Sequence, residues 1–310
     1  MKKIYYVIVL ICISVMMVNC GDSNRTEQED PKPVKVKQVY VPEFNSDSAY
    51  QYVQDQVDFG PRVPNTDAHN ECAKYLVSTM ERFGAKVIVQ KAKVKAYDET
   101  VLNIQNIISS FRPEVKRRVL LFAHWDSRPV ADHCESPELR DNPILGANDG
   151  ASGVGVLMEV GRQLGITNPN IGVDIIFFDA EDYGTPDHLD LPYKEDTWCL
   201  GSQYWSNNMH ELGYFPMYGV LLDMVGAKNA LFYKEQVSMY FAPDIVRKVW
   251  GTASKLGYSN YFIDMDGGQV IDDHLYVNKI ARIPSIDIIQ HDPTTDSKFG
   301  SFWHTHDDNM

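Results

Sequence analysis

The sequence predicts an α/β protein in which helices cover both faces of a twisted, mixed and mostly parallel β-sheet. Two observations carry this prediction. Short runs of almost continuous apolar residues are typical of strands buried on both faces, and they occupy residues 119–126, 173–182, 218–226 and 283–291. Between these runs, apolar residues recur at helical spacing in residues 152–165, 201–212 and 242–257. The alternation of strands and helices predicts a three-layer fold around one sheet.

The N-terminus has the character of an export signal. Lys2 and Lys3 precede an apolar run, residues 4–18, which is too short to span a bilayer comfortably and is typical of a signal peptide. The run ends at Cys20, and this segment resembles a bacterial lipoprotein signal with Cys20 as the acylated residue. Asn19 stands where Gly or Ala is usual, so ordinary cleavage and an uncleaved anchor stay open as alternatives. We therefore expect an exported protein, either periplasmic or membrane-anchored as a lipoprotein.

Three regions are expected along the chain: the signal segment 1–20, a linker at 21–45 and one folded domain from residue 46 to residue 310. The linker is polar and contains prolines, which suits a tether. In the folded domain, residues 66–84 carry apolar side chains at helical spacing, and Gly84 can end this helix in a left-handed conformation. Alternating, β-branched stretches at 85–97 and 102–111 then predict two strands.

Charge and cysteine content narrow the functional class. Asp and Glu number 42 against 29 Lys and Arg, which gives a net charge of -13. This balance argues against a domain that binds nucleic acid or an anionic membrane surface, and it suits an acidic site for a metal cation. Beyond the signal, Cys72, Cys134 and Cys199 lack the spacing of a cysteine zinc site. Unpaired thiols are therefore expected, with one disulfide as an alternative in an exported protein.

Polar side chains follow three of the four predicted strands at the point where each strand ends, namely His124 and Asp126, Glu181 and Asp182, and Asp223. Asp149 lies in a glycine-rich turn that opens a helix, and His304 and His306 lie near the end of the chain. Each feature alone could be a solvated turn, a helix cap or an ordinary histidine. Because ligands bind beyond the carboxyl ends of strands in open α/β sheets, their joint occurrence there predicts a catalytic metal site with oxygen and imidazole ligands.

Five motifs occur in the order AHWDS, GANDGASG, FFDAED, LLDMVG and WHTHDDN. In content and order they resemble the zinc-dependent exopeptidase family, which contains aminopeptidases and a non-peptidase branch, the glutaminyl-peptide cyclotransferases. The resemblance runs from about Phe59 to Asn309. It implies that the zinc ligands are Asp149, Asp182 and His304, and that Glu181 is the general acid and base. It also implies that His124 and Asp223 hold a second metal ion in dinuclear members.

Further motifs resemble the cyclotransferase branch: DFGPRVP at 58–64, LLDMVGAKN at 221–229 and IDDH at 271–274. In the last of these, the resemblance implies that Asp272 is catalytic. Trp303 directly precedes the metal histidine, and Trp198 corresponds to a second tryptophan of the cyclase pocket. We therefore expect a cyclotransferase. A dinuclear zinc aminopeptidase of the same family is the alternative, and a peptide- or sugar-binding lipoprotein on a degenerate hydrolase fold is a third hypothesis.

The implied reaction converts the N-terminal glutamine of peptides or proteins to pyroglutamate and releases ammonia, with one Zn²⁺ per chain. Glu181 would carry a proton from the attacking α-amine to the departing ammonia. Asp223 and Asp272 would hydrogen-bond the amine or the leaving group, and Trp198 and Trp303 would line a small apolar pocket. A membrane would be contacted only through the lipid anchor.

Some residues depart from the family pattern. The implied metal carboxylate is Asp182 where many members have Glu, and Asp287 stands where animal cyclases have His. Asp179, on the strand two residues before Glu181, is expected to be structural. The sequence ends at Met310, where relatives usually continue into a closing helix, which leaves a truncated sequence as an open alternative.

Overall fold

The computed structural model describes residues 40–167, 169–192 and 194–310. The predicted signal segment with Cys20, and the linker up to residue 39, lie outside these residues. From Pro42 to Met310 the chain forms one compact unit. Among the helices of the described residues, none has the length and apolar character needed to cross a membrane.

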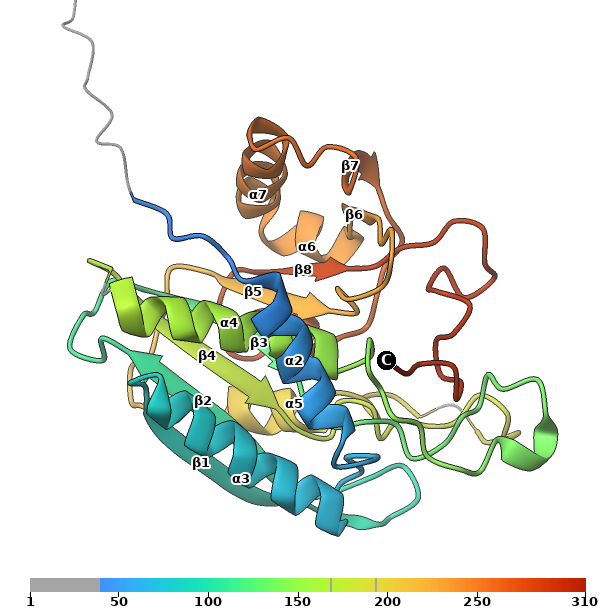
Figure 1. Ribbon diagram of the computed structural model, residues 1–310. Helices are drawn as coiled ribbons and strands as arrows, with labels where there is room; N and C mark the ends of the chain where they lie inside the picture. The colour runs from blue at the N-terminus through green and yellow to red at the C-terminus, as the bar shows by residue number, and fades with distance from the viewer. Residues whose placement is uncertain (1–39, 168, 193) are drawn as a thin grey trace, which may run out of the picture. The chain divides into compact units, whose positions relative to one another are not determined.

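A six-stranded sheet lies at the centre of this unit (Figure 1), in the order β1-β2-β4-β3-β5-β8. The pairs β1/β2 and β2/β4 are antiparallel, and the pairs β3/β4, β3/β5 and β5/β8 are parallel. The sheet is therefore mixed and mostly parallel, as predicted. Its strands are β1 (Lys86–Lys95), β2 (Val101–Phe111), β3 (Arg118–His124), β4 (Gly172–Phe178), β5 (Gly219–Asp223) and β8 (Ser285–Ile289). A separate parallel pair consists of β6 (Phe232–Lys234) and β7 (Phe262–Asp266).

Helices pack on both faces of the sheet. On one face lie α3 (Asp67–Arg82) and α4 (Ala151–Thr167), and α2 (Ser46–Val57) packs against α4. On the other face lie α5 (Leu200–Asn207) and α8 (Asp273–Lys279). Two further helices, α6 (Gln236–Phe241) and α7 (Pro243–Lys255), contact the edge strand β8. The three-layer architecture predicted from the sequence is therefore confirmed.

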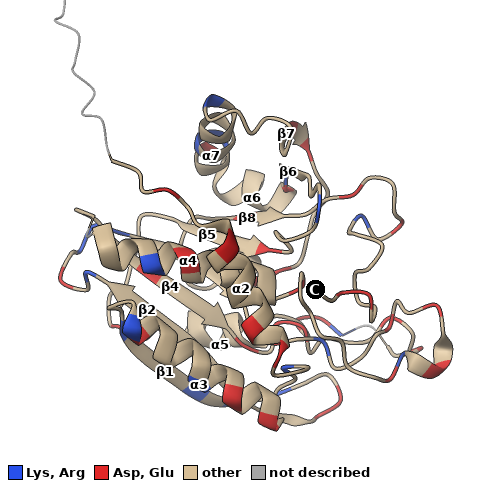
Figure 2. Cartoon of the chain, in the orientation of Figure 1, with Lys and Arg blue, Asp and Glu red and all other residues tan. Residues whose placement is uncertain are grey.

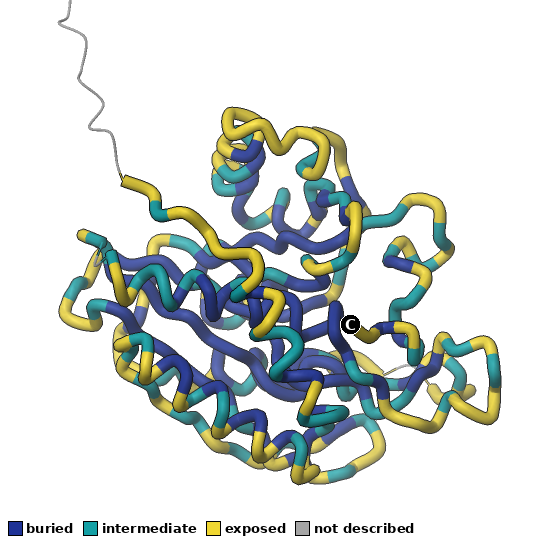
Figure 3. The backbone as a smooth tube through the Cα atoms, in the orientation of Figure 1, coloured by how far each residue is buried: buried dark blue, intermediate teal, exposed yellow. Residues whose placement is uncertain are grey.

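Neighbouring residues of the central strands pack into different cores. On β4, Ile175 and Phe177 pack with α3 and α4, whereas Ile176 and Phe178 pack with Trp205 of α5. Because both faces are covered, every residue of β4 is buried, which explains why its sequence is an almost continuous apolar run, interrupted by Asp174, rather than an alternating one. Figure 3 shows the strands as a buried layer between helices whose outer sides are exposed.

Most predicted elements are present, but their limits differ in places. The helix expected at 201–212 ends at Asn207, because the side-chain amides of Asn207 and Asn208 donate to backbone oxygens one turn earlier, at 2.9 Å each. Such bonds compete with continued helix formation. The sequence analysis did not predict the short elements β6, β7, α6 and α8, the helix α2, or the 3₁₀ helix Pro137–Leu139. Most of these elements are short, so their apolar periodicity is weak.

Candidate active site

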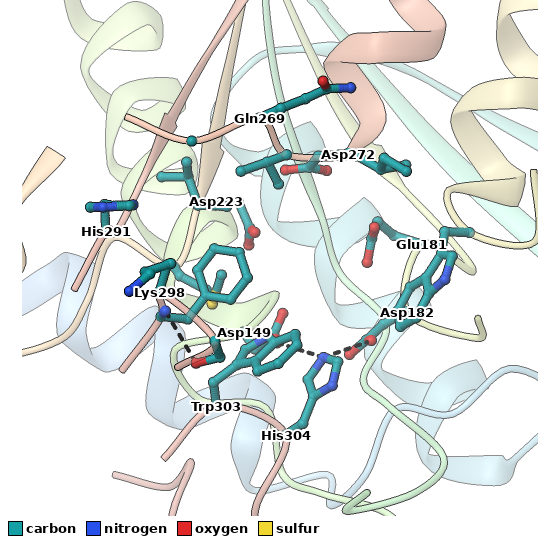
Figure 4. Close-up of a pocket in the computed structure, with 18 of the residues that line it drawn as sticks. Asp149, Glu181, Asp182, Asp223, Gln269, Asp272, His291, Lys298, Trp303 and His304 are labelled. Carbon is teal, nitrogen blue, oxygen red and sulfur yellow. Dashed lines mark hydrogen bonds and ion pairs between the residues drawn. The ribbon is translucent and has the colours of Figure 1, made fainter. Parts of the chain in front are cut away.

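The carboxyl ends of the parallel strands meet at one edge of the sheet. His124 ends β3, Asp223 ends β5, and Glu181 and Asp182 follow β4 after a short turn. Figure 2 shows Asp and Glu at the tip of β5 and in the loops beyond the strand ends. A cavity of about 380 Å³ opens at this edge (Figure 4). Its walls contain eight predicted site residues, which are Asp149, Glu181, Asp182, Trp198, Asp223, Asp272, Trp303 and His304.

Three of these side chains form a group that could hold a metal ion: Asp149, Asp182 and His304. His304 Nε2 lies 3.4 Å from Asp182 Oδ1 and 3.6 Å from Asp149 Oδ2. All three residues are buried, and Asp182 Oδ2 has no hydrogen-bond partner among the described residues. A buried carboxylate oxygen without a partner is unfavourable. The group therefore fits a bound cation, and its oxygen and imidazole donors suit a divalent metal ion.

A second group shares Asp149. His124 Nε2 lies 3.1 Å from Asp149 Oδ1 and 3.2 Å from Asp223 Oδ1. Burial lowers the pKa of His124, but the neighbouring carboxylates of Asp126, Asp149 and Asp223 outweigh this effect and raise the pKa well above its usual value. A carboxylate shared by two groups is what a dinuclear centre requires, so the side chains of the dinuclear alternative are also brought together.

Two buried aspartates fix the loops that carry the candidate metal ligands. Asp126 accepts hydrogen bonds from the consecutive backbone N–H groups of residues 181–182, at 3.1 and 3.2 Å. Asp308 does the same for residues 148–149, at 2.6 and 3.0 Å. Gly150 has a φ of +90°, and a Cβ there would lie 2.6 Å from the carbonyl oxygen of Asp126. Glycine is therefore required at this close approach.

Arg128 is a buried cation beside the metal-binding group, and the sequence analysis missed it. Its guanidinium forms a two-pronged ion pair with Asp132 and donates to the main-chain oxygen of Asp182 at 3.0 Å and to its carboxylate at 3.3 Å. Asp132 Oδ1 in turn lies 3.3 Å from His304 Nδ1, which orients the imidazole so that Nε2 is left for a metal. Arg128 also lies 4.5 Å from the ring centre of Trp198. This arginine therefore links the metal-binding residues to the cavity wall.

Glu181 and Asp272 both point into the cavity (Figure 4). Burial raises the pKa of the Glu181 carboxyl well above its usual value; His124 opposes this shift, while Asp272 and Asp182 reinforce it. Burial also raises the pKa of Asp272 to about 7, and the charge of Asp223 adds to the shift. Carboxyl groups with a raised pKa are suited to proton transfer.

Two tryptophans give the cavity apolar walls. The Trp303 ring stacks on His304, with ring centres 3.7 Å apart, and the Trp198 ring lies parallel to His304 at 6.0 Å. Trp198 packs directly on Gly184, where a Cβ would lie 2.0 Å from the indole. Both rings thus flank His304, where they present apolar surface to the cavity.

Other residues singled out in the sequence lie away from the cavity. Asp179 accepts hydrogen bonds from His69 Nε2 at 2.8 Å and from the backbone N–H groups of Gln105 and Ala180, so it has the structural surroundings expected of it. His306 is half-buried and does not line the cavity. Asp287 is fully buried behind Asp272, and burial raises its pKa well above the usual value, with the charge of Asp272 adding to the shift.

The sequence analysis also missed Cys199 and Asp273. All three cysteines that follow the signal are free thiols, as expected. Cys199, however, lies next to the site, with Sγ 3.1 Å from Glu181 Oε1. Asp273 is buried beside Asp272, and burial raises its pKa well above the usual value. Nothing in the spacing of these residues connects them to Glu181, since a long loop separates β4 from α5 and the IDDH motif follows α7.

Comparisons with known proteins agree with this geometry. The profile of Peptidase family M28 matches residues 106–310. A crystal structure of a Zn-dependent exopeptidase from Parabacteroides distasonis is 57% identical, covers 87% of this chain and 92% of its own, and superposes with a TM-score of 0.86. A glutaminyl cyclase from Bacteroides thetaiotaomicron, bound to N-acetylhistamine, is 55% identical with the same coverage and TM-score.

More distant similarity extends to animal proteins. The glutaminyl-peptide cyclotransferase of Bos taurus is 26% identical over 238 residues, which make up 67% of this chain and 60% of the bovine protein. The chain therefore aligns with about three fifths of the length of this relative.

Proposed function

The chain belongs to peptidase family M28, and from this premise we propose that it is a zinc-dependent glutaminyl-peptide cyclotransferase, an aminoacyltransferase. Its substrates are peptides or proteins that begin with glutamine, and its products are the pyroglutamyl peptide and ammonia. One observation carries the proposal: a single small cavity holds the metal-binding group, Glu181 and Asp272 between two tryptophans. A volume of about 380 Å³ is at the small end of the range for ligand pockets.

Asp149, Asp182 and His304 would hold one zinc ion, and the chemistry that zinc supplies when bound is Lewis-acid polarisation of the glutamine side-chain carbonyl. The nucleophile and the electrophile belong to the same residue of the substrate. The protein therefore has to hold the glutamine in a folded conformation, with the α-amine close to the γ-carbon. Trp198 and Trp303 supply the walls that favour this conformation and exclude water.

Glu181 moves the proton. It accepts a proton from the α-amine as the new C–N bond forms, and it donates that proton to the side-chain nitrogen as the old C–N bond breaks and ammonia leaves. Its raised pKa suits both halves of this task. Asp223 and Asp272, on the same side of the cavity in Figure 4, are placed to hydrogen-bond the amine and the leaving nitrogen.

The identity of 55% to the Bacteroides thetaiotaomicron glutaminyl cyclase supports this proposal. One specific observation favours the second candidate, a dinuclear zinc aminopeptidase: His124, Asp149 and Asp223 form a complete second metal-binding group. In that reaction Glu181 would deprotonate a water molecule that attacks a peptide carbonyl.

Incubation with a peptide that begins with glutamine separates the two candidates. For the cyclotransferase, mass spectrometry detects an intact chain that has lost ammonia, and ammonia appears in equal amount. A matched peptide that begins with leucine remains unchanged. Release of free amino acids from either peptide would overturn the proposal in favour of the aminopeptidase. Metal analysis is expected to find about one zinc per chain.

We also propose that the protein is exported and anchored by acylation of Cys20. The support is the sequence pattern of the first twenty residues. Expression with a labelled fatty acid is expected to label the wild-type chain but not the Cys20→Ser variant. Unlabelled wild-type protein that is recovered free in the periplasm would leave ordinary signal cleavage as the mechanism of export.

A further inference from the structure

Cys199 contacts Glu181 but takes no part in the reaction as described above. It precedes α5 in a left-handed backbone conformation, with a φ of +57°. This turn brings two groups of Cys199 to Glu181. The backbone N–H donates to the main-chain oxygen of Glu181 at 2.9 Å, and Sγ lies 3.1 Å from the carboxylate oxygen Oε1. One residue therefore holds both the backbone and the side chain of Glu181.

The surroundings decide what this thiol can do. Glu181, Cys199 and Asp272 have their polar atoms within 4.8 Å of one another, and all three residues are buried. Asp272 Oδ2 has no hydrogen-bond partner among the described residues. Hydrogen-bond donors for the carboxylates around the thiol are therefore few. Burial, and the charge of Glu181, raise the pKa of the Cys199 thiol well above its usual value. A buried, protonated thiol is neither a nucleophile nor a metal ligand, but it can donate a hydrogen bond.

We propose that Cys199 is a positioning residue for Glu181: its thiol holds Oε1 and thereby turns the carboxylate toward the substrate amine. This inference rests on the proposed function. A general base has to lie within hydrogen-bond reach of the proton it accepts. A donor that holds one carboxylate oxygen reduces the rotation of the side chain and leaves the other oxygen for the substrate. Because a thiol is a weak donor, its contribution is expected to be modest.

The test compares three cysteine variants with a glutamine-initiated peptide as substrate. Cys199→Ala removes the donor and is expected to lower kcat about five- to tenfold, with KM within about twofold. Cys199→Ser keeps a donor and is expected to retain kcat within about twofold of the wild type. Cys72→Ala is the matched control, because Cys72 is an equally buried thiol on the core-facing side of α3, and its kcat should not change. Rates are expressed per folded, zinc-loaded chain.

A double-mutant cycle distinguishes positioning from general support of the fold. Glu181→Asp withdraws the carboxylate from the thiol, so adding Cys199→Ala to it should lower kcat by less than it does in the wild type. If the alanine variant does not fold, Cys199→Gly replaces it, since glycine adopts a φ of +57° without strain.

Three outcomes would overturn the inference: unchanged kcat in Cys199→Ala, equal losses in the alanine and serine variants, or additive losses in the cycle. The wild type is measured first. If it forms no pyroglutamate, the proposed function fails and this inference fails with it. If it is active, a failure in the variants concerns Cys199 alone.

Discussion

The two ends of strand β4 accommodate buried carboxylates in opposite ways. At its start, Asp174 is buried and fully paired: Arg118 binds it through two nitrogens, and the hydroxyl groups of Ser110 and Tyr214 each donate to it at 2.7 Å. Just beyond its end, Asp182 is equally buried, yet one of its oxygens has no partner among the described residues.

This difference shows which buried carboxylate needs a ligand or a metal ion for its compensation. A buried charge that the protein compensates by itself is part of the scaffold, as at Asp174. A buried carboxylate left partly unpaired costs stability unless it takes up a proton or a ligand or metal ion completes it. The contrast along one strand therefore distinguishes a carboxylate of the scaffold from one that needs a ligand.

Metal removal should have the largest effect on activity. Its effect on the structure should be confined to the carboxylates just beyond the end of β4. We expect a zinc chelator to abolish turnover and to lower Tm, because the metal-binding carboxylates lose their counter-ion. Added zinc should restore both. Metal analysis, kinetics and thermal unfolding on the same sample check this expectation. Full activity in demonstrably metal-free protein would contradict it.

The Glu181→Gln substitution should have the second largest effect on activity. The amide keeps the shape of the side chain but cannot carry the proton, so kcat should fall by about 100- to 10,000-fold. The zinc content and Tm should stay close to those of the wild type, because Glu181 is outside the proposed ligand set. Near-normal turnover would remove Glu181 from the mechanism. A loss of zinc would instead place it among the ligands.

Arg118→Met tests the opposite end of the strand. It leaves Asp174 buried without its cation, and removing one partner of a buried ion pair typically costs about 3–5 kcal/mol of stability. Denaturant unfolding should show this loss, whereas kcat per folded chain should stay unchanged. If turnover falls more than stability does, the two ends of β4 are not independent and the comparison fails.

The Asp182→Asn substitution should give the smallest change in stability. In zinc-free protein it should stabilise the fold, whereas Arg118→Met destabilises it. In zinc-free protein, the neutral amide replaces a carboxylate whose pKa is raised mainly by burial, with the charge of Asp149 adding to the shift. We expect the zinc-free variant to be about 1 kcal/mol more stable than the zinc-free wild type, although it no longer binds zinc. Chemical unfolding in chelator checks the sign. A marked loss of stability would mean that Asp182 is already compensated by the protein.

Much of the fold could be predicted because its signals are local. The continuous apolar runs that became β3, β4, β5 and β8 reflect burial on both faces, and Gly84 ends α3 with a φ of +92° as expected. Short elements such as α8 gave weaker signals. Asp272 of the IDDH motif is the N-cap of that helix, where its side chain accepts a hydrogen bond from the backbone N–H of Asp273.

The sequence alone determined the sheet and the edge at which polar residues collect, because the ends of strands are marked by neighbouring residues. The motifs and their resemblance to a known family indicated eight of the side chains that line the cavity. Only the tertiary structure revealed what surrounds them. Arg128 and Asp132 reach the site from the loop after β3, Cys199 from the turn before α5, and Asp308 from the C-terminal segment. The charge balance at each carboxylate depends on these neighbours. Electrostatic energy depends on distance in space and on burial, and neither is encoded in the spacing of residues along the chain.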